Sequence, residues 1–82
     1  IKTIMTGEAK DPHTMVFDGR GHIWFTSQGS NRVGRLNLAT DKVDLITPHD
    51  QPSNPYGIVI DQKGTVWVAL LRAGMIAKID PQ

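Results

Sequence analysis

The stretch Asp18-Gly-Arg-Gly-His-Ile-Trp-Phe-Thr26 is the main indication of the fold, because it occurs a second time, in altered form, as Asp61-Gln-Lys-Gly-Thr-Val-Trp-Val-Ala69. The two copies lie 43 residues apart, and the alignment extends without a gap over residues 11–39 and 54–82. A repeat of about 40–45 residues with several strands per unit is typical of β-propeller blades. The sequence therefore predicts an all-β protein built from two blades.

Each copy of the repeat combines a glycine turn with an apolar strand. Glycine supplies positive φ in the turn, and Asp18 is placed to accept backbone hydrogen bonds there. Ile23, Trp24 and Phe25 are consecutive, whereas a strand with one wet face would alternate apolar and polar residues. Both faces of this strand should thus be covered, as they are in a propeller blade. Trp24 and Trp67 share a repeat position, so we expect both to be buried.

The strand pattern divides the chain into one complete blade and most of another. The first blade, residues 12–47, is predicted to have strands at 13–17, 22–27, 32–38 and 42–47. The second, residues 55–79, is predicted to have three strands, at 56–60, 65–71 and 75–79. Residues 1–6 resemble residues 42–47, so we interpret them as an outer strand that completes a blade.

Composition excludes several classes of function. The 82 residues carry a net charge of +1, which gives no reason to expect nucleic acid or an anionic membrane as a partner. No apolar run approaches the roughly 20 residues that span a bilayer. There is no cysteine, so a disulfide and a thiolate site are both excluded. The chain starts at Ile1 without a signal-peptide pattern, and we expect a processed, excised or engineered segment whose compartment the sequence does not indicate.

Polar side chains gather at one end of the predicted blades. His13 and Tyr56 each follow a proline at the start of the first strand of their unit. Antiparallel pairing places the end of the second strand beside it, which brings Ser27 and Gln28 near His13, and Arg72 near Tyr56. The first strand lines the channel of a propeller, and the channel mouth is a natural ligand site. His13 is thus a candidate catalytic residue, and the other four are candidate ligand-binding residues.

Each candidate also has a plainer interpretation. A histidine that follows proline is often a solvated turn residue, and Tyr56 is able to stack on Pro55. Arg72 either holds an anionic ligand or is simply an exposed loop residue. His49 lies in the connection between the units and is a further ligand-binding candidate if it reaches the first rim. Phosphate-binding loops, paired cysteines and the His-Glu-x-x-His zinc motif are absent from the sequence.

Three stretches carry a family resemblance: Asp11-Pro-His-Thr-Met-Val-Phe-Asp-Gly-Arg-Gly-His-Ile-Trp-Phe-Thr26, Asn31-Arg-Val-Gly-Arg-Leu36 and Asn54-Pro-Tyr-Gly-Ile-Val-Ile-Asp-Gln-Lys-Gly-Thr-Val-Trp67. They resemble blades of the virginiamycin B lyases, also called streptogramin lyases, over nearly the whole chain. The resemblance implies a seven-bladed propeller that opens a cyclic depsipeptide antibiotic by elimination, with magnesium, histidines and glutamates at the channel mouth. By position, it implies a functional role for His13 and a ligand-facing place for Tyr56.

The sequence departs from this family where the metal would bind. In the family, Trp-Phe-Thr is usually followed by a glutamate, and the metal-binding glutamates come from that region. Ser27 and Leu70 occupy the two equivalent positions here. Magnesium needs hard oxygen ligands, commonly carboxylates. We therefore predict no metal ligand and no cofactor in this chain, with magnesium bound only if the family site is retained, and we leave open whether the chain is an enzyme.

Three functions remain open. The first is a structural or assembly unit of a lyase-type propeller, without catalysis of its own. The second is a subunit of a virginiamycin B lyase-like carbon-oxygen lyase whose site forms at the channel mouth on assembly. The third is a small-ligand binding module. The strand count favours self-association into a head-to-tail ring, since residues 1–6 would complete the last blade of a neighbour. A homotrimer with six blades is preferred over a homotetramer with eight.

Overall fold

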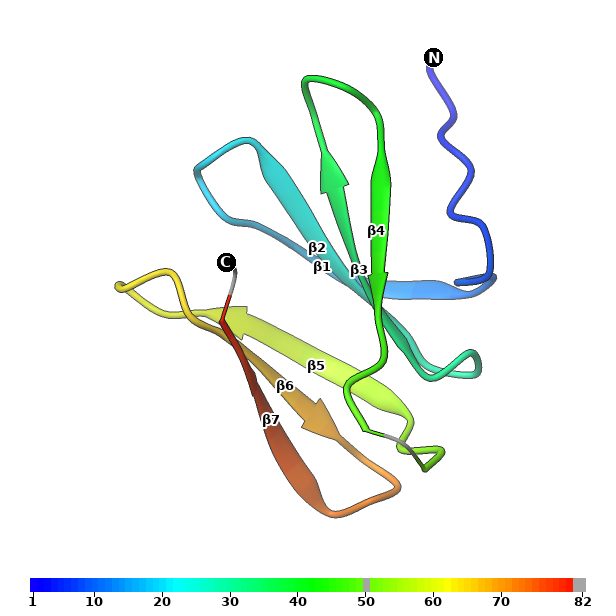
Figure 1. Cartoon of the computed structure of the whole chain (residues 1–82), viewed down its shortest axis with the longest axis vertical. Helices are drawn as coiled ribbons and strands as arrows, with labels where there is room; N and C mark the ends of the chain where they lie inside the picture. The colour runs from blue at the N-terminus through cyan, green and yellow to red at the C-terminus, as the bar shows by residue number, and fades with distance from the viewer. Residues whose placement is uncertain (50, 81–82) are drawn as a thin grey trace.

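Seven strands form two antiparallel sheets in the computed structural model, which describes residues 1–49 and 51–80 (Figure 1). The first sheet, here called blade 1, has the order β1-β2-β3-β4, with β1 at Pro12–Phe17, β2 at His22–Ser27, β3 at Arg32–Asn37 and β4 at Val43–Ile46. Blade 2 has the order β5-β6-β7, with β5 at Pro55–Ile60, β6 at Val66–Leu70 and β7 at Met75–Ile79. The predicted all-β class and both predicted meanders are confirmed, with strand ends that differ by one residue at most.

An aspartate closes the first turn of each blade. The Asp18 carboxylate accepts hydrogen bonds from the backbone N–H of Arg20 at 2.7 Å and of His22 at 3.1 Å, and from the indole Nε1 of Trp24 at 3.3 Å. Asp61 accepts the same three bonds in blade 2, including one from Trp67 Nε1 at 2.9 Å. The repeated motif thus ties each turn to the aromatic side chain of the following strand.

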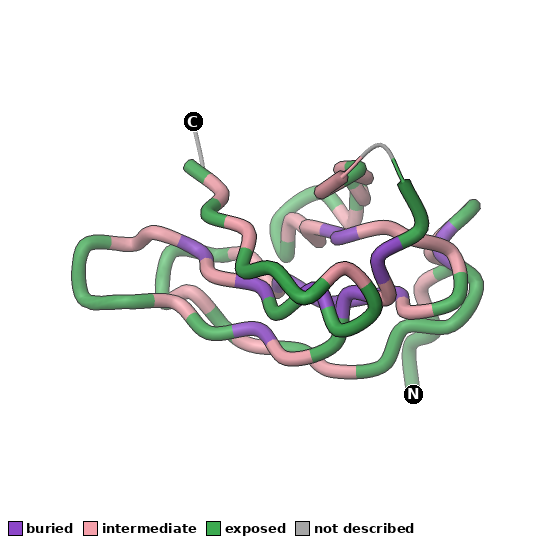
Figure 2. Tube along the Cα trace, turned by 90° about the horizontal axis from the view of Figure 1, so that it is seen from below, coloured by how far each residue is buried: buried purple, intermediate pink, exposed green. Residues whose placement is uncertain are grey.

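The main core lies between the two sheets. Blade 1 contributes Trp24 and Val33, and blade 2 contributes the buried side chains of Ile58, Val66, Val68 and Leu70. β5 packs against both β1 and β2. Figure 2 shows buried stretches in the interior of the trace and exposed ones at the turns at either end. One face of each apolar strand therefore meets the other blade, while the faces that carry Ile23, Phe25 and Trp67 point away from it.

The two tryptophans are not equally buried, which corrects the expectation for Trp67. Trp24 is 1% exposed because blade 2 covers it, whereas Trp67 is only partly buried. Trp67 lies on the opposite face of its sheet from Val66 and Val68, since successive strand residues point to opposite faces. No other blade of the described chain covers that face. Equal repeat positions thus give unequal burial where one blade has a neighbour and the other has none.

Residues 1–6 form no strand in this chain, contrary to the secondary structure expected for them. A strand needs a partner, and β7, whose blade they were expected to complete, belongs to the other blade (Figure 1). The segment is tied to blade 1 by an ion pair between Lys2 and Asp41, which lies in the β3–β4 turn. Its pairing with another chain remains a prediction.

Candidate functional site

His13 and Tyr56 lie side by side, as their repeat positions predict. The ring centroids are 4.8 Å apart and the ring planes are inclined by 39°. His13 comes from β1 and Tyr56 from β5, the two strands through which the blades meet. Both side chains are exposed, and the His13 Nδ1 shares a 2.9 Å hydrogen bond with the Thr14 hydroxyl. The pair offers an imidazole and a phenol on one open surface, which is a basis for contacting a small aromatic or polar ligand.

Ser27 is brought to the same end of blade 1 but is not available to a ligand. It is fully buried, and its hydroxyl donates a 2.5 Å hydrogen bond to Asp11. The Asp11 carboxylate also accepts bonds from the Gly29 backbone N–H at 2.6 Å and from the Ser30 hydroxyl at 3.2 Å. The Ser27 bond, followed by the Gly29 bond, lowers the pKa of Asp11. Ser27 therefore helps to fix the β2–β3 loop.

Asp11 is the residue of this region that the sequence prediction missed. Its hydrogen bonds hold the loop after β2 against the start of β1, and this loop includes the candidate Gln28. Spacing gave no signal for Asp11, because its bonds reach Ser27, Gly29 and Ser30, which lie 16, 18 and 19 residues away in sequence. Gln28 itself is partly buried.

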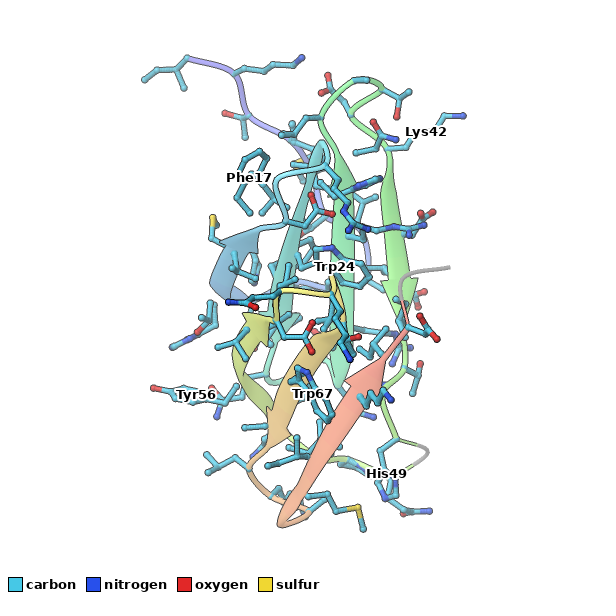
Figure 3. All side chains as sticks on the ribbon, turned by 90° about the vertical axis from the view of Figure 1, so that its left-hand side faces the viewer. Phe17, Trp24, Lys42, His49, Tyr56 and Trp67 are labelled. Atoms are coloured by element: carbon cyan, nitrogen blue, oxygen red, sulfur yellow. The ribbon has the colours of Figure 1, made fainter. Side chains whose placement is uncertain are left out.

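His49 lies away from Tyr56 (Figure 3). Its backbone carbonyl accepts a 3.1 Å bond from Asn31 Nδ2, while Asn31 Oδ1 accepts a 2.7 Å bond from the Ser53 hydroxyl. Asn31 thereby fastens the connection between the blades to the β2–β3 loop. Figure 3 shows His49 and Tyr56 at opposite edges of the molecule. His49 is thus separated from Tyr56 (Figure 3), and its contribution to a ligand site at the rim stays a prediction.

Arg72 and Leu70 mark the equivalent end of blade 2. Arg72 is exposed in the β6–β7 turn, and its backbone N–H donates a 2.9 Å bond to the Ser53 carbonyl. Leu70, at the position equivalent to Ser27, is 3% exposed and belongs to the core between the blades. Arg72 is thus a positive charge at this end of blade 2, and Leu70 is a packing residue.

The residues present do not fit the magnesium site that the family resemblance implies. Of the two positions where that family carries glutamates, Ser27 holds a hydroxyl committed to Asp11 and Leu70 holds a buried alkyl chain. Within residues 1–49 and 51–80, no group of three or more His, Asp or Glu side chains is arranged to hold a metal ion. The same residues include no helix long and apolar enough to cross a lipid bilayer.

A second surface is apolar. The side of blade 2 that points away from blade 1 forms a groove lined by Gly57, Ile58, Val59, Trp67, Val68, Ala69 and Ile76. Val59 is 61% exposed and Ile76 is 72% exposed, while Lys78 Nζ stands 5.8 Å from the centre of the Trp67 ring. Figure 3 shows the Trp67 side chain on β6, over the ribbon that faces the viewer. We call this surface the blade 2 outer face and define it by Gly57, Val59, Trp67, Ala69 and Ile76.

The paired antiparallel sheets, packed face to face with their first strands side by side, define the chain as β-propeller blades. Two solved structures of virginiamycin B lyase from Staphylococcus aureus share this fold. A catalytically inactive variant with quinupristin matches at a TM-score of 0.64 and 22% identity, over 87% of this chain and 27% of that chain. A selenomethionine-substituted form matches at a TM-score of 0.64 and 23% identity, over 83% of this chain and 26% of that chain.

The likeness to these lyases is one of fold, and this chain spans about a quarter of their length. No protein-family model matches the sequence, and none of the curated proteins does. The predicted relation to lyase-type propellers is confirmed at the level of the blades.

Proposed function

We propose that this chain is a structural two-blade unit of a lyase-type β-propeller, which works by packing against further blades and has no catalysis of its own. The blade 2 outer face carries the proposal, since it leaves Val59 and Ile76 more than half exposed around a partly buried tryptophan. Contiguous exposed apolar surface of this kind marks an interaction site. β7 adds an unpaired sheet edge, at which Met75 is 51% exposed.

The unit assembles with itself in a head-to-tail ring. Residues 1–6 of one chain pair with β7 of the next, and three chains with six blades are favoured over four chains with eight. Light scattering across a range of concentrations tests this proposal. The expected result is a mass that is a multiple of the 9.0 kDa chain, accompanied by a blue shift of tryptophan emission as Trp67 becomes covered. A mass of one chain at every concentration would refute it.

A small-ligand binding module is the second candidate, and the contact between His13 and Tyr56 favours it. The lyase-like subunit is the third, and the committed hydroxyl of Ser27 and the buried side chain of Leu70 argue against it. One assay separates the lyase-like subunit from the structural unit. Magnesium-dependent opening of a streptogramin B antibiotic by the pure protein, lost in His13→Ala, would replace the structural proposal by the enzymatic one.

A further inference from the structure

We infer that the partner of the blade 2 outer face is the outer face of blade 1 of a second copy of this chain, docked as blade 2 docks on blade 1 within the chain. The blade 1 outer face is defined by Met15, Phe17, Ile23 and Phe25. The inference rests on the proposed function and names the surfaces through which that assembly forms. It follows from the repeat, because each exposed face has a covered counterpart inside the same molecule.

The blade 2 outer face is the repeat of a face that is already covered in blade 1. Trp67 is equivalent to Trp24, and Ile76 is equivalent to Val33. Trp24 and Val33 are 1% and 0% exposed, whereas Ile76 is 72% exposed. Each face also carries a cationic side chain over its tryptophan: Arg35 Cζ stands 5.5 Å from the centre of the Trp24 ring, and Lys78 Nζ stands 5.8 Å from the centre of the Trp67 ring. A partner that covers the first face therefore indicates the kind of surface that fits the second.

The cover of Trp24 and Val33 is the inner side of blade 2, formed by Ile58, Ile60, Val66 and Val68. The repeat equivalents of these four residues are, in order, Met15, Phe17, Ile23 and Phe25. Val16 packs against the core, so its neighbours on β1 point the other way, and Met15 and Phe17 are 64% and 61% exposed. Ile23 is partly buried and Phe25 is 3% exposed, so Met15 and Phe17 are the accessible part of this face. The chain thus presents on blade 1 an apolar surface equivalent to the one that covers Trp24 and Val33 in its own interior.

The two outer faces differ in size from their covered counterparts, and the differences partly compensate. Met15 is longer than its equivalent Ile58, and Phe17 is wider than Ile60. The receiving face is smaller at Gly57 and Ala69, where blade 1 has Thr14 and Thr26, and larger at Ile76, where blade 1 has Val33. The groove at Gly57 and Ala69 leaves room for the longer and wider side chains. Apolar surfaces gain most when they are close-packed, so the paired change favours this partner.

The turns give a second point of contact. Within the chain, the Arg20 guanidinium lies against Gly64, close enough that a Cβ at Gly64 would stand 3.1 Å from its Nη1. The equivalent pair between two copies is Lys63 of one chain and Gly21 of the next. Gly21 has open space around it in the single chain. The same kind of contact, a long cationic side chain over a glycine turn, is therefore possible both within the chain and between two copies.

Two polar links of the internal junction are not repeated. The Thr26 hydroxyl donates a 2.8 Å bond to the Tyr56 carbonyl, and Asn31 binds Ser53. Ala69 and Gly74 occupy the equivalents of Thr26 and Asn31 and have no such groups. Apart from the proposed pairing of residues 1–6 with β7, the junction between copies is thus held mainly by apolar contact, and we expect it to dissociate on dilution.

Two variants, each blocked on one face, test the inference by sedimentation velocity. Phe17→Asp places a charge on the blade 1 outer face, and Ile76→Asp places one on the blade 2 outer face. Both side chains are more than 60% exposed, so the blades should still fold, which circular dichroism checks. Thr40→Asp, in the exposed β3–β4 turn, is the matched control for the added charge.

Wild type and Thr40→Asp should associate, and each face variant alone should sediment as one chain. An equimolar mixture of Phe17→Asp and Ile76→Asp should form a one-to-one complex of twice the 9.0 kDa chain mass, because each variant keeps the face that the other lacks. Association of either face variant alone at the wild-type level, or a mixture that stays monomeric, would overturn the inference while leaving the proposed assembly in place. A wild-type chain that never associates would refute both.

Discussion

Gly34 is the position where one methyl group should disturb blade 1 most sharply. Gly34 on β3 is paired with Phe25 on β2, and the Phe25 ring lies across it. A Cβ at Gly34 would stand 2.0 Å from Phe25 Cζ and 2.3 Å from Cε1. Carbon atoms in contact are separated by about 3.5–4.0 Å, so the ring would have to move by about 1.5 Å or more. Phe25 is 3% exposed and has little free space to enter.

We expect Gly34→Ala to lower the free energy of unfolding by about 1–3 kcal/mol, the usual cost of overpacking a core. An 82-residue domain has a total stability of about 4–12 kcal/mol, so the variant should still fold. Gly57→Ala is the control, because a Cβ there would meet only the Ala69 Cβ at an ordinary 3.9 Å. Urea denaturation followed by tryptophan fluorescence measures both variants.

The equivalent positions in blade 2 indicate which second substitution should compensate for Gly34→Ala. Val68 and Ala77 occupy in blade 2 the positions of Phe25 and Gly34, and they are paired in the same way. The double variant Phe25→Val, Gly34→Ala should therefore be more stable than the sum of its single changes predicts, with a coupling of about 1 kcal/mol or more. A Gly34→Ala protein as stable as wild type, or strictly additive single changes, would refute the close contact.

Three other outcomes follow from the burial, the charges and the N-terminal segment. Trp24→Ala should cost about 3–5 kcal/mol, and Trp67→Ala less than half of that in the monomer, because only Trp24 is covered; an equal loss in urea denaturation would contradict the difference. The pKa of Asp11 is lowered in the folded state, so its carboxylate contributes stability above its ordinary pKa of about 4, and this stability is lost as the pH falls through the lowered pKa. Asp11→Asn should therefore reduce the loss of stability at acidic pH. An unchanged loss of stability at acidic pH would contradict this. Deleting residues 1–6 should leave the circular dichroism spectrum of the blades intact but abolish the oligomer seen by light scattering; an oligomer that persists would exclude the strand exchange.

The fold class could be predicted from the sequence, because each repeat unit contains the residues that form its turn and its strands. Gly21 and Gly64 adopt positive φ in the turns, at 91° and 86°, and the aspartate that opens each turn binds both its backbone and the next tryptophan. These contacts span at most six residues, so the spacing in the sequence is enough to predict them. The repeat also placed His13 beside Tyr56, since equivalent strand starts of adjacent blades meet at one edge.

The burial and the bonding partner of a given residue, by contrast, depend on tertiary contacts. Trp24 and Trp67 are equivalent in the repeat, yet their burial differs because one face has a neighbouring blade and the other has none in the described chain. Likewise, the sequence predicts Ser27 as a rim residue, but its hydroxyl is hydrogen-bonded to Asp11, which lies sixteen residues away in sequence. Burial and hydrogen bonding between distant segments depend on where the chain brings those segments together, and no local pattern encodes that position.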